Sequence, residues 1–107
     1  MKALLVFCNV PDRALAERIA AALVGERLAA CVNLMAPCRS VYRWEGQVEW
    51  SDEVPLIIKT TADAYPRLEQ RLRALHSYSV PEIVACDIAG GLPDYLTWVG
   101  EQVFSSE

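Results

Sequence analysis

Five side chains in this sequence have the chemistry to bind a soft metal. They are the four cysteines and the single histidine: Cys8, Cys31, Cys38, Cys86 and His76. A thiolate suits Cu(I) and an imidazole suits Cu(II). The cysteine spacing contains no CxxC pair, which excludes a zinc knuckle. One histidine cannot complete a metal site alone, but three subunits lending cysteine, histidine or carboxylate groups near an interface could build one.

Each of these residues also has a purely structural interpretation. Cys8, Cys31 and Cys86 lie in strand-like apolar runs, where free cysteines usually serve as small buried hydrophobes. Cys38 lies at a predicted bend and is a candidate for incidental oxidation. His76 ends a predicted helix, and a cation there is stabilised by roughly 0.3–1 kcal/mol. Histidine serves equally well as a ligand, so both roles stay open.

Lys59 and Glu82 are charges beside apolar strand segments. Such charges are usually paired or placed at a cleft, so one interpretation is an ion pair that fixes the neighbouring loop. The other is a ligand cleft between subunits, in which Lys59 attracts an anionic group and Tyr42, Trp44 and Tyr95 line the walls.

An enzyme acting on a small anionic ligand is the alternative use of that cleft. It would employ His76 or Glu82 as acid or base, with Lys59 stabilising an anion. No nucleophile–base pair is recognisable from the spacing, so no catalytic residue is assigned. A binding or signalling module is the first hypothesis, and a purely structural protein is the third.

The elements that must position these side chains follow the order β-α-β-β-α-β, with a closing helix. Their periodicity predicts strands at residues 3–8, 28–34 and 82–88, and a hairpin between residues 30 and 61. It predicts helices over residues 13–24, from the Asp63 cap to His76, and over residues 95–104. Asp12 and Asp63 are the expected N-caps of the first two helices. This order predicts a ferredoxin-like α+β fold, with an antiparallel sheet and two helices on one face. A doubly wound parallel sheet needs crossovers where this chain has a hairpin.

The hairpin is the most informative segment. Strand-like runs flank the dipeptide Glu45-Gly46, a two-residue turn signature that places Trp44 opposite Gln47. The register predicts a base over residues 30–36 and 56–61 and a bent tip over residues 39–50. An arm of about 14 residues spans about 45 Å, which exceeds the width of a domain of this size.

Two prolines define the expected bend. The register places Pro37 opposite Val54, next to Pro55. Proline is confined to strand edges, strand starts and bulges, so both arms are expected to break at nearly the same height.

The hairpin tip carries aromatic side chains on both sides, and an isolated two-stranded ribbon is marginal in water. The tip is therefore expected to pack on other subunits. The residues predicted at this interface are Tyr42, Trp44, Trp50 and Trp98.

Composition limits the protein classes. The 107 residues suffice for one domain, 1–107, and 53% of them are apolar, which is rich for a domain of this size. The net charge of −4 and the absence of a basic run argue against nucleic acid as a partner. No segment reaches the ~20 apolar residues of a membrane span, and no signal peptide is recognisable. A cytoplasmic protein with reduced thiols is expected.

Five blocks along the chain resemble the CutA family of divalent-cation tolerance proteins. The blocks are LAACVN at residues 28–33, SVYRWEG at residues 40–46, IKTT at residues 58–61, HSYSVPEI at residues 76–83 and YLTW at residues 95–98. Pro55 and Cys38 depart from the common pattern. The resemblance implies a homotrimer with hairpins packed across subunit boundaries, similar in assembly to the PII signalling proteins. It also implies copper or other metal binding, with Cys8 and His76 as candidate ligands, no obligatory cofactor and no established reaction.

Overall fold

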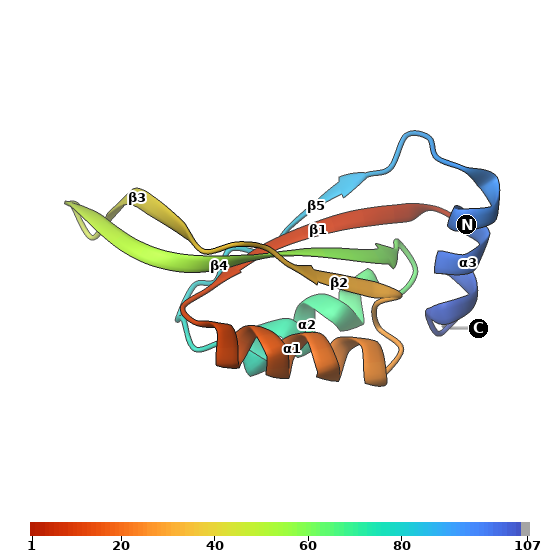
Figure 1. The fold of residues 1–107 in the computed structure, drawn as a ribbon, viewed down its shortest axis with the longest axis horizontal. Coiled ribbons are helices and arrows are strands. Elements are labelled where there is room, and N and C mark those ends of the chain that lie inside the picture. The colour runs from red at the N-terminus through yellow and green to blue at the C-terminus, as the bar shows by residue number, and fades with distance from the viewer. Residues whose placement is uncertain (106–107) are drawn as a thin grey trace.

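The computed structural model describes residues 1–105, which form a mixed α+β fold with the predicted order of elements (Figure 1). The strands are β1 (Ala3–Val10), β2 (Cys31–Leu34), β3 (Cys38–Trp44), β4 (Gln47–Thr61) and β5 (Val84–Asp87), and the helices are α1 (Arg13–Gly25), α2 (Tyr65–Leu75) and α3 (Pro93–Gln102). The sheet order is β2-β4-β1-β5, with β3 paired to β4 and every pair antiparallel. This architecture confirms the ferredoxin-like prediction.

Helices α1 and α2 cover one face of the sheet (Figure 1). Alternate residues of the central strands point towards them, because successive strand side chains face opposite sides. Val6 and Cys8 of β1 and Leu56 and Ile58 of β4 are buried there. They join the helix residues that form the core, which include Ile19, Leu23, Leu68 and Leu72.

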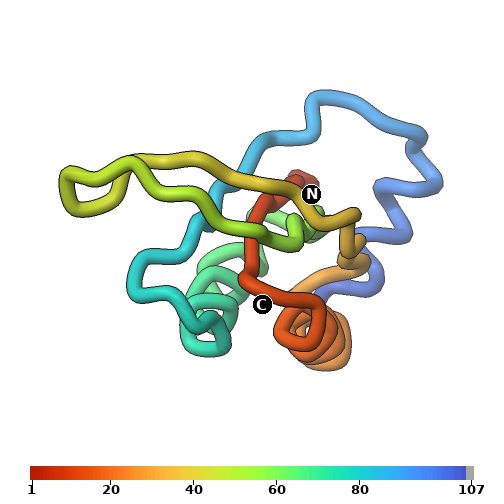
Figure 2. The backbone as a smooth tube through the Cα atoms, turned by 60° about the vertical axis from the view of Figure 1, so that its left-hand side comes forward, coloured from red at the N-terminus to blue at the C-terminus, as the bar shows by residue number. Residues whose placement is uncertain are grey.

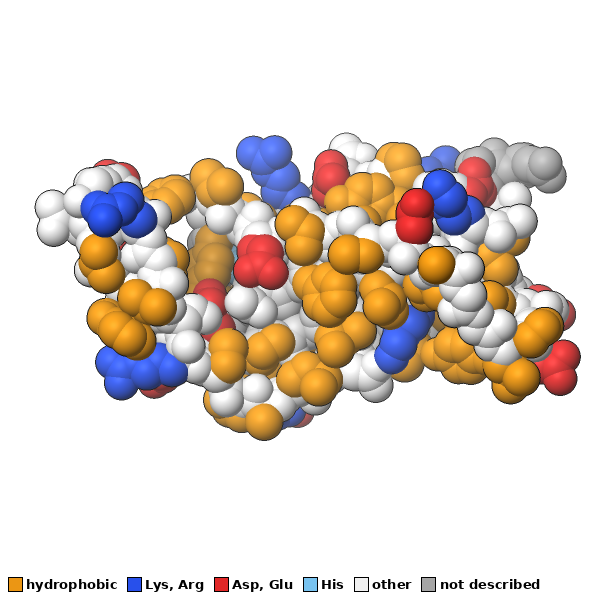
Figure 3. Space-filling view, turned by 90° about the horizontal axis from the view of Figure 1, so that it is seen from above, with side chains coloured by type: hydrophobic (Ala, Val, Ile, Leu, Met, Phe, Trp, Pro, Cys, Tyr) orange, Lys and Arg blue, Asp and Glu red, His pale blue; other side chains and the backbone are white. Residues whose placement is uncertain are grey.

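No helix within residues 1–105 covers the opposite face of the sheet, which we call the open face. Register and alternation place Leu5, Phe7, Ile57, Cys31 and Cys86 on it. Seen from this side, hydrophobic side chains gather over the middle of the molecule (Figure 3). An antiparallel sheet commonly packs one apolar face on the core and leaves its other face polar and solvated. Here α1 and α2 bury one face, yet the open face is apolar as well.

The hairpin of β3 and β4 projects away from the rest of the molecule (Figures 1 and 2). With the hairpin included, the longest extent of the molecule is 44 Å. Its register runs from Cys38↔Glu53 to Trp44↔Gln47, as predicted. Glu45 and Gly46 both have positive φ angles, 50° and 79°. This pair of left-handed residues is typical of a type I′ turn, whose twist matches that of the flanking strands.

The predicted break in both arms is wrong for β4, which runs unbroken through Pro55. Only the first arm is interrupted, between β2 and β3, where one extra residue separates Leu34↔Leu56 from Cys38↔Glu53. The Pro55 carbonyl accepts a hydrogen bond from the Met35 N–H at 2.9 Å, so the Pro55 nitrogen also faces the interrupted arm. Proline therefore costs no ladder hydrogen bond at this position.

The ends of several elements also differ from expectation. Asp12 caps α1 as predicted, since its Oδ1 accepts from the Leu15 N–H at 2.8 Å. Asp63 is not the cap of α2: Ala64 takes that position, and its N–H donates to Thr61 Oγ1 at 3.2 Å. The predicted strands at residues 28–34 and 82–88 shorten to β2 and β5, and the last helix begins at Pro93 and ends at Gln102.

Candidate functional site

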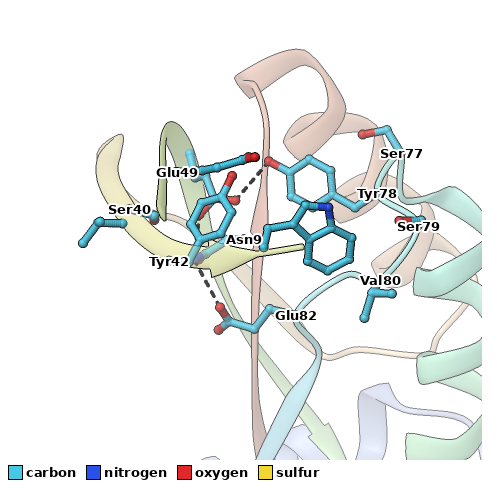
Figure 4. Close-up of a pocket in the computed structure, with 12 residues that line it drawn as sticks. Asn9, Ser40, Tyr42, Glu49, Ser77, Tyr78, Ser79, Val80 and Glu82 are labelled. Atoms are coloured by element: carbon cyan, nitrogen blue, oxygen red, sulfur yellow. Dashed lines mark hydrogen bonds between the residues drawn. The ribbon is translucent and has the colours of Figure 1, made fainter. Parts of the chain in front are cut away.

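A groove of about 690 Å³ lies between the hairpin and the loop that follows α2, and we call it the hairpin groove. Its lining residues are Asn9, Ser40, Val41, Tyr42, Trp44, Glu49, Glu53, Ser77, Tyr78, Ser79, Val80 and Glu82. The hairpin supplies one wall and residues 77–82 the other, with Asn9 at the end of β1 between them (Figure 4). The site thus joins three segments far apart in sequence.

The floor of the hairpin groove is a buried carboxylate. Glu53 is 8% exposed. Its Oε2 accepts from the Tyr78 hydroxyl at 3.0 Å and its Oε1 accepts from Asn9 Nδ2 at 3.3 Å. Burial and this hydrogen bond to Glu53 raise the pKa of Tyr78, which keeps the phenol protonated as a donor. Asn9 Nδ2 also lies 3.3 Å from Glu82 Oε1, so one amide ties the two walls together.

His76 fastens the second wall to β1. Its Nε2 lies 2.8 Å from the Asn9 carbonyl oxygen, which only accepts, and its Nδ1 lies 3.1 Å from the Tyr78 N–H, which only donates. The ring is therefore the tautomer that carries its proton on Nε2. It is buried and packs against the Tyr78 ring, with the centroids 4.7 Å apart. Both nitrogens are engaged, so His76 offers no free lone pair in this conformation.

Cys8 lies beneath the hairpin groove and is fully buried among core residues. Burial, followed by the negative charges of Glu82 and Glu53, raises the pKa of its thiol from 9.0 to about 12. The thiol is therefore protonated at neutral pH, and a metal would have to displace that proton to bind it. Copper ligation by Cys8 and His76 requires this region to open.

The Cys8 thiol predicts a pH dependence of stability. Its pKa is 9.0 when unfolded and about 12 when folded, so the folded protein holds one proton more between these values. The free energy of unfolding should then fall as pH rises through this window, by up to ~1.4 kcal/mol per pH unit from this group. Urea unfolding at one protomer concentration, at pH 8 and pH 10.5, should show a shallower fall in Cys8→Ala. Equal falls in both proteins would contradict the assignment.

The predicted ligand cleft is divided in a single protomer. Tyr42, Trp44 and Glu82 line the hairpin groove, whereas Lys59 and Tyr95 do not. Lys59 Nζ donates to Asn33 Oδ1 on the open face. Tyr95 lies on α3, where its ring is 5.7 Å from that of Trp98. Only a neighbouring subunit could unite all five cleft residues.

Helix α3, which carries Trp98, lies at the opposite end of the molecule from the hairpin tip (Figure 1). Trp44 and Trp50 lie on that tip, and the cross-strand pairs Val41↔Trp50 and Trp44↔Gln47 place their side chains on its two sides. Trp50 is 59% exposed. The predicted interface residues therefore form separate surfaces of one protomer.

Nine of the twelve lining residues were not predicted as site residues, and three of these nine, Asn9, Glu53 and Tyr78, form the hydrogen-bond network of the groove. The register offered a signal for Glu53. Glu49, Ser51 and Glu53 are every second residue of β4, and Glu49 pairs with Tyr42, so all three lie on the Tyr42 side of the hairpin. Nothing local marked Asn9 as the residue that bridges both walls.

Residues 1–105 contain no group of three or more His, Cys, Asp or Glu side chains arranged to hold a metal ion. Within the same residues, no helix has the length and apolar character that crossing a membrane requires.

The fold and the hairpin groove define a ferredoxin-like protein with a preformed groove beside a long hairpin. Residues 4–102 match the family described as CutA1 divalent ion tolerance protein. The chain therefore belongs to the CutA1 divalent ion tolerance family.

Relatives and solved structures agree with this membership. The chain is 51% identical over 96 residues to the divalent-cation tolerance protein CutA of Thermus thermophilus, covering 90% of this chain and 93% of the relative. It is 41% identical to the CutA of Pectobacterium atrosepticum over 97 residues, 91% of this chain and 88% of the relative. The crystal structure of CutA1 from Oryza sativa superposes with a TM-score of 0.96 at 38% identity, covering 99% of this chain and 97% of the other.

Proposed function

We propose that the protein is a homotrimeric binding module that contributes to divalent-cation tolerance by capturing a ligand in the hairpin groove. Family membership supports the link to tolerance. The observation that carries the binding role is the buried Glu53 carboxylate, held by Tyr78 and Asn9 on the groove floor. Such a network fixes the walls before a ligand arrives, which lowers the cost of binding.

The contacts in the groove support binding over catalysis. A general base needs an unoccupied lone pair within reach of the substrate, and both nitrogens of His76 bond within the chain. The Cys8 thiol is buried and protonated. An enzyme acting on a small anionic ligand is further disfavoured because Lys59 bonds to Asn33, outside the groove lining.

The trimeric part of the proposal is supported by the open face and the exposed hairpin. Both sides of the tip carry exposed apolar side chains, including Val41, Val48 and Trp50 on one side. Packing between subunits would remove this surface from water. An assembly of the PII type, with interfaces at Tyr42, Trp44, Trp50 and Trp98, is our proposed arrangement.

Copper and location complete the proposal. Copper is the proposed metal, reached by Cys8 and His76 only when the region around Asn9 opens. A cytoplasmic location is proposed because the four cysteines are free thiols and a reducing compartment keeps them so.

A tolerance assay tests the proposed function. A bacterial strain lacking its own CutA1 relative should tolerate more copper when it expresses this protein. Glu82→Gln should reduce that gain, because Glu82 lies on the groove wall and bonds to Asn9. Glu17→Gln, on the exposed side of α1, is the matched control and should retain the gain at equal protein levels.

Two further results complete the assay. Full tolerance with Glu82→Gln would exclude the groove as the functional site, and no gain from the wild type would exclude the tolerance role. Copper titration of the reduced protein tests direct ligation: a loss of affinity of tenfold or more in both Cys8→Ser and His76→Ala would assign the metal to this pair, and unchanged affinity would exclude it.

A further inference from the structure

The charges around the hairpin groove all have one sign. Glu49, Glu53 and Glu82 line it, and no lysine, arginine or histidine is among its described lining residues. Glu53 and Glu82 are tied together by the neutral amide of Asn9, which cancels neither charge. An anionic ligand would be repelled here, and a cation attracted.

The three carboxylates do not converge on one point, although Glu53 and Glu82 approach each other through the shared Asn9 amide. Glu49 and Glu53 are four residues apart on the same side of β4, so their backbones are about 13 Å apart at about 3.3 Å per residue. Glu82 comes from the other wall, and in Figure 4 Glu49 and Glu82 lie on opposite sides of the Tyr42 ring. A metal ion needs oxygen ligands converging within about 2.6 Å, and residues 1–105 hold no such group.

Between the carboxylates, the walls are aromatic and apolar. Tyr42 and Trp44 on β3, together with Tyr78 and Val80 on the loop, share the lining. The proposed trimer also places Tyr42 and Trp44 at a subunit boundary, so the groove opens at that boundary in the assembly. Aromatic faces attract ammonium groups and also accept methylene chains. Carboxylates separated by such walls match a ligand in which positive charges alternate with short hydrocarbon segments.

We propose that the hairpin groove binds a linear aliphatic polyamine, in which two or more ammonium groups are separated by methylene chains. Its ammonium groups pair with the carboxylates of Glu49 and Glu82 and with the small exposed part of the Glu53 carboxylate. Its methylene groups lie on the aromatic walls. This inference rests on the proposed use of the groove as a binding site and names the class of ligand.

Isothermal titration of the intact assembly with spermidine tests the inference. Glu49→Gln and Glu82→Gln, both at exposed positions, should each weaken binding about tenfold, the scale of one charge-assisted hydrogen bond. Butylamine, with a single ammonium group, should bind at least about tenfold more weakly than spermidine for the same reason. Asp52→Asn is the matched control: Asp52 precedes Glu53 on β4, faces the opposite side of the hairpin, and its loss should leave affinity unchanged.

Several results would overturn the inference. Equal weakening by Asp52→Asn would reduce the effect to general attraction by an acidic protein. Equal binding of butylamine and spermidine would show that the site does not recognise spaced positive charges. Binding of inorganic phosphate in place of spermidine would show that the groove attracts anions.

The inference and the proposed function fail separately. If spermidine does not bind and Glu82→Gln still abolishes copper tolerance, the polyamine inference is wrong and the proposed function stands. If spermidine binds as expected and Glu82→Gln retains full tolerance, the polyamine inference stands and the proposed function is wrong.

Discussion

An Ile57→Asp variant is expected to be monomeric at micromolar protomer concentrations at which we expect the wild type to be trimeric. Ile57 lies on the open face, directly opposite Phe7 of β1 and Asn33 of β2. If this face packs against other subunits, each trimer would bury three new carboxylates. An unpaired buried charge costs several kcal/mol, and a trimer would incur this cost three times. Sedimentation velocity across a dilution series measures the outcome.

Two controls separate assembly from folding in this experiment. Ile57→Val keeps the apolar surface and should remain trimeric. Ala14→Asp adds the same charge at an exposed position in the first turn of α1, where the helix dipole favours it, and should also remain trimeric. A trimeric Ile57→Asp would remove the open face from the interface, and a monomeric wild type would end the trimer proposal.

The fold was predictable because its determinants are local. The Glu45-Gly46 turn fixes the hairpin register by itself, since two residues in left-handed conformation close a tight turn. Alternation then assigns each strand residue to a face. The bend was predicted only in part, because the effect of Pro55 depends on which neighbouring strand its nitrogen faces. That direction is set by pairing across the sheet, as the hydrogen bond from the Met35 N–H to the Pro55 carbonyl shows.

The site was less predictable because it depends on distant segments. Tyr42, Trp44 and Glu82 could be chosen by residue type, but the second wall of the groove is attached to β1 by His76, which bonds to Asn9, 67 residues away. Lys59 was expected beside them as a charge near a cleft. The odd–even alternation of β4 instead places it on the open face with Ile57.

His76→Ala is expected to lower the free energy of unfolding of the metal-free protein by about 2–4 kcal/mol. The change removes the contact to the Asn9 carbonyl, leaves the Tyr78 N–H without its acceptor and deletes a buried ring packed on Tyr78. Urea unfolding in the presence of a chelator, at fixed protomer concentration, measures the loss. Arg73→Ala, exposed in the last turn of α2, should change stability by less than about 0.5 kcal/mol.

The same measurement separates the two roles left open for this histidine. A residue retained only as a metal ligand would contribute nothing to the stability of the metal-free protein, so an unchanged unfolding midpoint would favour ligation. A large loss would mean that the ring holds residues 77–82 against β1 and so forms one wall of the hairpin groove. Reduced ligand binding by His76→Ala would then report a displaced wall, because the Tyr78 hydroxyl would no longer be positioned to reach Glu53.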